Sequence, residues 1–201
     1  KSGLTSELIV IEPDPTYEFA ATPRAIGGIR FVQGLIENLK MSLYGRYVFK
    51  NFARELNIQE DFVDLNFHEC GYLFLGTGNT VKAFEENYRM LSEGGADIKL
   101  MDRRSLESLL PSFNFKDIDV GLYSPSDSRI DPYSALRGFK RAAIDLGVEY
   151  KKDRVVDINH DHRRVNSVKL ESGTFIPVDI IINAANCWAP DICKMVGMKV
   201  P

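Results

Sequence analysis

The segment Leu8–Glu12 constrains the fold more than any other part of the chain. An apolar run that favours a β-strand ends there in a single carboxylate, that of Glu12. In dinucleotide-binding sheets such a carboxylate follows the second parallel strand, about 20 residues after a glycine-rich phosphate turn. Only eleven residues precede Glu12, so the segment predicts the second strand of such a unit without the first. An ordinary buried strand followed by an acidic turn is the alternative.

The charge of Glu12 also limits the class of dinucleotide. A carboxylate accepts hydrogen bonds from ribose hydroxyls and repels a 2′-phosphate, which favours ligands that resemble NAD or FAD. A pyrophosphate site further requires glycines and a helix N-terminus. Residues 1–4 can supply only the tail of that helix. The sequence therefore predicts an incomplete dinucleotide-binding domain.

The composition indicates a soluble globular protein. The 201 residues are 44% hydrophobic and 26% charged, with a net charge of −3. Because a nucleic-acid-binding surface carries an excess of basic residues, we expect no nucleic-acid partner. No apolar run approaches the ~20 residues that span a bilayer, so we expect no transmembrane segment. Cys70, Cys187 and Cys193 are odd in number and lack close pairing, and they predict neither a disulfide framework nor a four-thiolate metal site.

Apolar spacing and turn residues predict helices and strands along the chain. Leu35, Leu39, Leu43 and Tyr47 recur every four residues and predict a helix with one buried face that ends near Leu56. Asp131-Pro132 predicts the start of another helix, which continues to Leu146. Further helices are predicted over residues 80–93 and 104–110, and strands over 71–76, 98–101, 148–150, 154–159 and 165–170. The apolar segment 178–183 predicts a strand buried on both faces of a parallel sheet.

Two groups of small residues are candidates for ligand contact. Gly27 and Gly28 would let the backbone approach a flat or anionic ligand, and the nearby Arg30 would supply a bidentate donor to a carboxylate. An ordinary turn is the alternative for these glycines. Ala184 and Ala185 follow the predicted last strand, where a doubly wound sheet binds its ligand. Close helix packing explains their small size equally well.

We predict no metal site. His160 and His162 lie in a polar hairpin, and His68 with its neighbours Glu69 and Cys70 lacks a second cluster to complete a site. No Ser-His-Asp order, nucleophile elbow or kinase-type phosphate loop occurs. The chemistry would therefore come from a cofactor.

Five segments, taken in order, resemble the D-amino-acid-oxidase-like family of FAD-dependent oxidoreductases, which includes glycine and sarcosine oxidases. They are residues 9–15, 27–30, 128–133, 155–158 and 182–188. The resemblance implies an α/β fold with a partial FAD-binding Rossmann-like domain, residues 1–66 and 124–201, that lacks its first βα unit. Residues 67–123 would be the α+β insertion, part of a strand-rich substrate-binding domain. The chain would thus be incomplete at both ends, and Asn186 stands where the family usually has glycine, a change that asparagine's tolerance of left-handed backbone makes mild.

The resemblance also implies roles for single residues. Arg30 would lie near the flavin ring as the catalytic candidate, where a cation stabilises the reduced flavin or attracts a substrate carboxylate. The FAD-binding candidates are Glu12 for the adenosine ribose, Gly27, Gly28 and Arg30 for the flavin, Val155 for the adenine through its backbone, and Ala184 and Ala185 beside the dinucleotide.

The function implied is oxidation of the C–N bond of a small amine or amino acid, of the glycine, sarcosine or D-amino-acid type, by hydride transfer to FAD. We expect the isolated chain to be inactive. A partner chain or an electron acceptor would complete the active oxidoreductase. The location would be cytoplasmic, or mitochondrial if a targeting segment has been lost. A non-catalytic assembly or interaction module of the same flavoprotein fold is the alternative. A nicotinamide-dependent dehydrogenase also fits Glu12 but leaves Gly27 and Gly28 unexplained.

Overall fold

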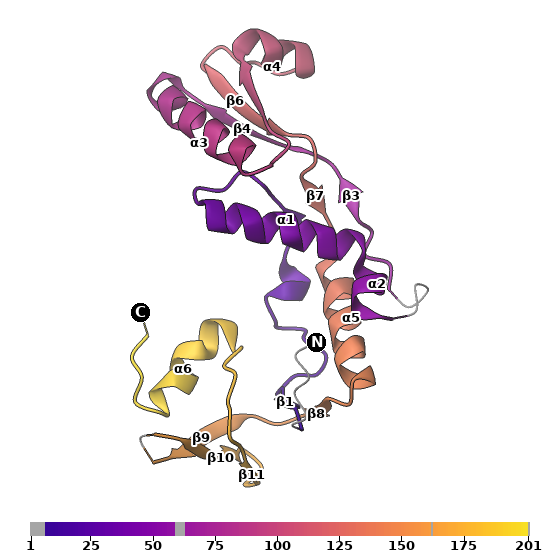
Figure 1. Cartoon of the computed structure of the whole chain (residues 1–201), viewed down its shortest axis with the longest axis vertical. Helices are drawn as coiled ribbons and strands as arrows, with labels where there is room; N and C mark the ends of the chain where they lie inside the picture. Colours follow the sequence, from indigo (N-terminus) through magenta and orange to yellow (C-terminus); the bar gives the residue numbers. More distant parts are fainter. Residues whose placement is uncertain (1–6, 59–62, 162, 201) are drawn as a thin grey trace. The chain divides into compact units, whose positions relative to one another are not determined.

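A computed structural model of the chain describes residues 7–58, 63–161 and 163–200. The chain divides into two compact units (Figure 1). Residues 20–142 form one of them, called here the continuous unit, and residues 1–19 with 143–201 form the other, the discontinuous unit. The predicted helix tail at residues 1–4 and the side chain of His162 lie outside the described residues.

The continuous unit contains two antiparallel sheets of three strands each. The first has the order β4 (Tyr72–Gly76), β6 (Val120–Ser124) and β5 (Lys99–Asp102). Helix α3 (Val81–Glu93), which contacts β5 and β6, and helix α4 (Arg103–Leu109) accompany it (Figure 1). The second has the order β2 (Gly28–Ile29), β7 (Ser128–Arg129) and β3 (His68–Glu69). The strands and helices predicted between residues 71 and 110 are confirmed to within about one residue.

The predicted first helix is present but is interrupted. It forms α1 (Ile36–Lys50) and α2 (Phe52–Leu56), separated by Asn51 at φ −118° and ψ 30°. The predicted buried face is only partly correct, because Leu39 is fully buried whereas Leu35 is 60% and Tyr47 47% exposed. Leu35 precedes the helix in extended backbone, and the Tyr47 hydroxyl donates a hydrogen bond to Glu55 on α2.

Helix α5 (Pro132–Asp145) begins where the sequence predicts. The carboxylate of Asp131 accepts hydrogen bonds from the backbone amides of Tyr133 and Ser134, at 3.1 Å each, and so caps the first turn. The chain leaves the helix through Gly147 at φ 88°, a left-handed conformation that glycine adopts without steric cost.

Two apolar cores stabilise the continuous unit. Leu39 of α1, Leu91 of α3 and Leu122 of β6 meet in the first, together with Phe31 and Ile98. The second contains Phe52, Leu65, Ile130 and Ala135. In the part of the chain that the structure describes, no helix is long and apolar enough to span a membrane.

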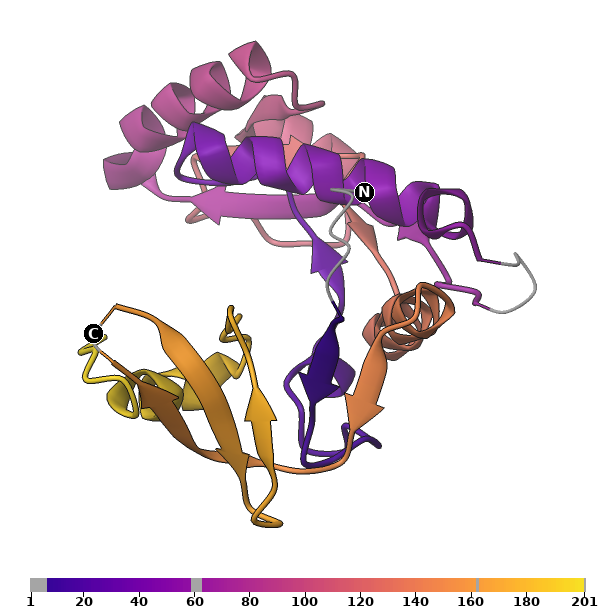
Figure 2. The same cartoon turned by 60° about the horizontal axis from the view of Figure 1, so that its bottom comes forward.

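The discontinuous unit joins segments from both ends of the sequence. Strand β1 (Ile9–Ile11) pairs in parallel with β8 (Glu149–Lys151), and the two lie side by side in Figure 2. An antiparallel sheet follows, in the order β11 (Phe175–Pro177), β10 (Val165–Leu170) and β9 (Val155–His160). The chain then passes through a short 3-10 helix, η4 (Asn186–Trp188), into α6 (Ala189–Lys194). The core of this unit is formed by Ile158, Val168 and Leu170.

The strand predicted over residues 178–183 is wrong. The segment has no regular structure, and Ile180 and Ile182 are 75% and 78% exposed. A strand requires a neighbour that accepts and donates its backbone hydrogen bonds. Among the described residues no strand pairs with this segment, although the amide of Val178 donates to the carbonyl of Asn166 at 3.0 Å. Ile181, between the exposed isoleucines, packs against the core.

Candidate functional site

Glu12 lies at the carboxyl end of β1, where its backbone amide donates to the carbonyl of Lys151 at 3.0 Å and extends the parallel pairing. Its side chain is half-buried, and Oε1 accepts the amide of Asp14 at 2.9 Å. A carboxylate offers about four acceptor sites. The turn therefore fixes the orientation of Glu12 while leaving it capacity to accept hydrogen bonds from a diol such as a ribose.

Tyr17 closes the turn after Glu12 and was not singled out from the sequence. Its amide donates to the carbonyl of Asp14 at 2.9 Å, and its backbone is left-handed at φ 59°. Burial raises the pKa of its phenol to about 12, and the nearby Tyr150, Glu12 and Asp14 act in the same direction. Tyr17 is thus a neutral group beside Glu12 at physiological pH. A tyrosine in a polar turn carries no sequence signal for this position.

Val155 begins β9, the edge strand of its sheet. One row of backbone groups on an edge strand faces away from the sheet and is open to a ligand. Val155 also packs into the same core as Ile11, the residue before Glu12. The fold therefore brings the segments that carry Glu12 and Val155 to one core, although they are far apart in the sequence.

Ala184 and Ala185 lie in the irregular segment before η4. The amide of Ala185 donates to Asn183 Oδ1 at 3.2 Å, and its carbonyl accepts the amide of Trp188 at 2.9 Å. Asn186, where the family usually has glycine, has φ 50° and so lies in the left-handed region. Asparagine adopts this conformation at lower cost than most residues.

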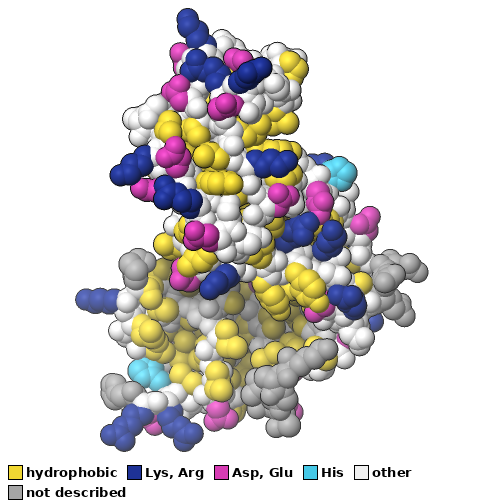
Figure 3. All heavy atoms as spheres, turned by 45° about the horizontal axis from the view of Figure 1, so that its top comes forward, with side chains coloured by type: hydrophobic (Ala, Val, Ile, Leu, Met, Phe, Trp, Pro, Cys, Tyr) yellow, Lys and Arg dark blue, Asp and Glu magenta, His cyan; other side chains and the backbone are white. Residues whose placement is uncertain are grey.

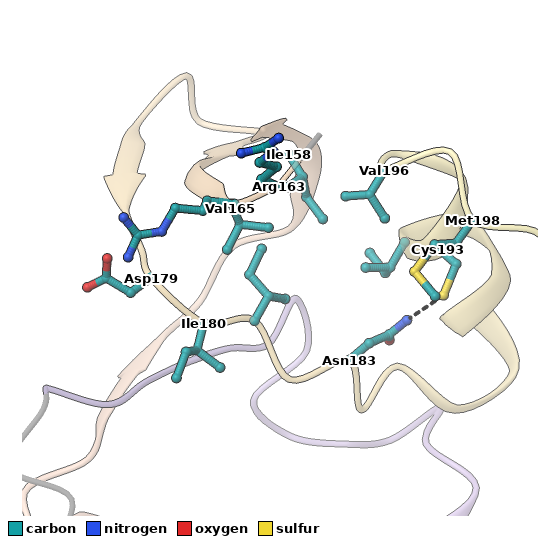
Figure 4. A pocket seen from close by; sticks show the side chains of 12 residues that line it. Ile158, Arg163, Val165, Asp179, Ile180, Asn183, Cys193, Val196 and Met198 are labelled. Carbon is teal, nitrogen blue, oxygen red and sulfur yellow. Dashed lines mark hydrogen bonds between the residues drawn. The ribbon is translucent and has the colours of Figure 1, made fainter. Parts of the chain in front are cut away.

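A cavity of about 480 Å³ lies between the hairpin of β9 and β10, the segment 179–183 and α6 (Figure 4). Its apolar wall includes Ile158, Ile181 and Val196, and Arg163 and Asp179 also line it. Asn183 borders it and donates from Nδ2 to Cys193 Sγ at 3.4 Å. Ala184 and Ala185 are not lining residues. Sequence inspection missed this cavity because separate segments form it.

Gly27 and Gly28 lie in the continuous unit, where packing against the backbone requires a glycine at position 27. Gly27 has φ 76°, and a Cβ there would lie 2.2 Å from the carbonyl oxygen of Ile130. A Cβ on Gly28 would lie 2.7 Å from the hydroxyl of Tyr72. The backbone contact accounts for Gly27 without a ligand, whereas the Tyr72 hydroxyl is the end of a side chain and does not by itself require a glycine at position 28. A role in lining the flavin stays a prediction.

Arg30 follows β2 as an exposed cation. Its guanidinium carbon lies 5.7 Å from the ring centroid of Tyr72, a distance at which the ring attracts the charge. The aromatic ring thus restricts the side chain while leaving its donors accessible to an anion.

Asp127, in the turn between β6 and β7, is fully buried. Its Oδ1 accepts the amide of Phe31 at 3.0 Å and the hydroxyl of Ser124 at 2.6 Å, whereas its buried Oδ2 has no hydrogen-bond partner among the described residues. Burial raises the pKa of this carboxyl, opposed by its hydrogen bonds and by the charges of Arg30 and Arg46. An aspartate in a Ser-Pro-Ser-Asp sequence predicts only a turn, so this position was also missed.

The described residues contain no group of three or more His, Cys, Asp or Glu side chains that could hold a metal ion. His68 lies exposed on β3 beside Glu69, whose carboxylate pairs with Arg46 and with Lys50. The hydrogen bond from Lys50 and the charges of Arg46 and Lys50 lower the pKa of Glu69. Glu69 therefore functions as a counter-ion here.

Comparisons with known proteins agree over most of the chain. The family model described as FAD dependent oxidoreductase (DAO) matches residues 1–201. "FAD-dependent oxidoreductase domain-containing protein 1" of Xenopus laevis is 28% identical over 212 residues, which cover 96% of this chain and 42% of that protein. Human mitochondrial dimethylglycine dehydrogenase is 28% identical over 140 residues, which cover 68% of this chain and 16% of that enzyme.

Solved structures share the fold. L-proline dehydrogenase from P. horikoshii superposes with a TM-score of 0.79 at 23% identity, over 98% of this chain and 57% of that chain. This likeness confirms the predicted α/β class with a partial Rossmann-type fold. The chain spans less than half the length of the curated relatives that it matches.

Proposed function

Because the chain belongs to the DAO family of FAD-dependent oxidoreductases, we propose that it is part of an enzyme that oxidises the C–N bond of a small amine or amino acid. Relatives named for dimethylglycine, sarcosine and L-proline support this substrate class. Bound FAD supplies the hydride acceptor for such a reaction. Since the chain covers 42% of its Xenopus relative, the activity is assigned to the whole protein.

The position of Glu12 carries the cofactor part of the proposal. Its half-buried carboxylate lies at the carboxyl end of a parallel strand, the edge at which sheets of this class bind nucleotides. This acceptor fits the hydroxyls of an adenosine ribose, because the carboxylate is oriented by the turn and retains acceptor capacity. Val155 would meet the adenine through the open edge of β9, and Ala184 and Ala185 would let the backbone pass close to the dinucleotide.

In the continuous unit, we assign Arg30 to the flavin ring and the substrate. Its accessible guanidinium would pair bidentately with a substrate carboxylate or stabilise negative charge on the reduced ring. Gly27 and Gly28 would line the flavin through their backbone. Residues 1–66 and 124–201 would form the FAD-binding domain. Residues 67–123, which contain β3, β4, β5 and all but the last residue of β6, would belong to the substrate-binding domain.

A visible absorption spectrum of the full-length protein, taken before and after denaturation, tests the cofactor assignment. We expect a flavin spectrum and bleaching when a small secondary or primary amine of the amino-acid type is added without oxygen. A bound flavin that no such amine reduces would favour the assembly module instead. We expect the 201-residue chain alone to bind FAD weakly or not at all, and a tight stoichiometric complex would contradict this.

The substitution Glu12→Gln tests the ribose contact in full-length apoprotein. It keeps the size of the side chain and removes its charge, and hydrogen bonds to charged groups contribute roughly 1.5–3 kcal/mol. We therefore expect the dissociation constant for FAD to rise at least about tenfold. Glu149→Gln is the matched control, because Glu149 lies opposite Ile9 on β8 and is exposed. Equal effects of the two substitutions would contradict the assignment.

The substitution Arg30→Ala tests the catalytic assignment, with the exposed Arg104 of α4 as the matched control. We expect Arg30→Ala to lower turnover and the flavin midpoint potential, and Arg104→Ala to change neither. Unchanged turnover and potential in Arg30→Ala would refute the role of Arg30.

An electron acceptor or partner chain would reoxidise the flavin of the whole protein. We further propose a cytoplasmic location, or a mitochondrial one for a form that carries a targeting segment, as the name of dimethylglycine dehydrogenase suggests. Imaging of the tagged full-length protein distinguishes the two.

A further inference from the structure

A buried carboxylate lies where three segments of the continuous unit meet. Asp127 receives the amide of Phe31, directly after Arg30, on its side-chain Oδ1 at 3.0 Å. Its backbone carbonyl accepts the amides of Cys70 and Gly71 at 3.0 Å each, in the link between β3 and β4. One residue thus holds the segment after β2 with its side chain and the link between the two sheets with its main chain.

The surroundings make the side-chain bond a strong constraint. Phe31 and Asp127 are 2% and 0% exposed, so water cannot replace the carboxylate as acceptor for the Phe31 amide. Ser124 donates to the same Oδ1 at 2.6 Å and fixes the carboxylate in turn. The guanidinium of Arg46 lies 6.0 Å from the Phe31 ring centroid, and its Nε donates to the carbonyl of Ser126 at 3.2 Å. The backbone around Phe31 is therefore held from more than one side.

A buried carboxylate with an unsatisfied oxygen such as Oδ2 destabilises the fold relative to an apolar side chain at the same position. The presence of this cluster despite that cost indicates that its geometry has a role. Its consequence is local. The hydrogen bond to Phe31 fixes the position of the backbone from which the Arg30 side chain extends. The ring of Tyr72, on β4 directly after Gly71, lies close to the same guanidinium.

We propose that Asp127 is a positioning residue for Arg30, which it holds by anchoring the Phe31 amide to the link between β3 and β4. The functional part of this proposal rests on the proposed role of Arg30, whereas the anchoring part does not. Asp127 itself touches neither substrate nor cofactor in this assignment.

Amide hydrogen exchange in the full-length, FAD-containing protein tests the anchor. We expect Asp127→Ala to speed exchange at Phe31 about tenfold, the worth of one hydrogen bond, while Cys70 and Gly71 keep their protection because the main-chain carbonyl remains. Asp127→Asn retains an acceptor oxygen and should leave Phe31 protected. Ser124→Ala, which removes only the second donor, should have a smaller effect than Asp127→Ala. Unchanged exchange at Phe31, or an equal increase at all three amides, would overturn the anchor.

A double-mutant cycle with Arg30→Ala tests the consequence, with KM for the amino-acid substrate and the flavin midpoint potential as readouts. We expect Asp127→Ala to raise KM about tenfold when Arg30 is present and to change it little in the Arg30→Ala background. Asp127→Asn should restore KM. Additive effects would overturn the positioning role. If Arg30→Ala alone changes neither readout, the proposed role of Arg30 fails, and amide exchange alone then decides the anchor.

Discussion

The continuous and the discontinuous unit differ in how completely their apolar segments are buried. In the continuous unit, the apolar faces of α1, α3 and β6 meet in a closed core around Leu39, Leu91 and Leu122. In the discontinuous unit, the apolar run from Val178 to Ile182 lies outside any sheet, with Ile180 and Ile182 largely exposed. Single exposed apolar side chains occur in both units, and Figure 3 shows several as yellow surface.

The difference shows how helices and strands depend on their surroundings. A helix satisfies its backbone hydrogen bonds within itself, so α3 and α5 form where the local pattern predicts them. A strand depends on a neighbour for those bonds. Residues 178–183 have a strand's composition, but no described strand pairs with them. Apolar composition alone therefore cannot make a segment part of a sheet.

The largest effect is expected in the closed core. Leu122→Ala should lower the free energy of unfolding by about 3 kcal/mol, because it removes a fully buried side chain and leaves a cavity. Urea denaturation of the 201-residue chain measures it. Leu75→Ala, on the neighbouring β4 but 43% exposed, is the control and should cost much less. Equal costs would show that this core is not closed.

A somewhat smaller loss of stability is expected at Gly27, which precedes β2 and packs against the Ile130 carbonyl. Gly27→Ala should cost about 2 kcal/mol, from left-handed backbone and from the clash with the Ile130 carbonyl. Gly95→Ala separates the two causes, since Gly95 has φ 89° but nothing within 4 Å of a Cβ. The difference between the two midpoints of thermal unfolding measures the clash, and no difference would remove it as a cause.

The cap of α5 should contribute about 1 kcal/mol, which Asp131→Ala removes. Hydrogen bonds from Ser134 and Tyr133 hold the pKa of Asp131 below its ordinary value of 3.8. A lowered pKa means that the stabilisation is fully present above that value and is lost as the pH falls below it. Urea titrations at neutral and acidic pH should therefore show the largest difference from wild type at neutral pH. A stability difference that does not change with pH would indicate that the charge of Asp131 does not contribute to the cap.

The smallest effect is expected in the open segment of the discontinuous unit. Ile182→Ala should change the unfolding free energy of the 201-residue chain by less than about 0.5 kcal/mol, since its side chain is 78% exposed. Leu170→Ala, in the core of the same unit, is the contrasting variant. A large loss of stability in Ile182→Ala, measured by urea denaturation, would mean that this segment is packed.

The sequence by itself determined the family and those local elements that depend on neighbouring residues. Helical spacing placed α3 and α5, and the Asp-Pro pair placed the cap at Asp131. Each of these depends on residues a few positions apart, so the local pattern contains the physical cause. The family followed from segments in a shared order, confirmed over residues 1–201.

Only the tertiary structure decided what depends on distant residues. Strand β1 pairs with β8, which lies far along the sequence, and Gly27 is required by the carbonyl of Ile130. A turn aspartate, Asp127, is a buried acceptor for the amide of Phe31. The absence of a strand at residues 178–183 belongs here as well. Burial and strand pairing depend on which segments meet, and the sequence around each residue does not specify its neighbours in space.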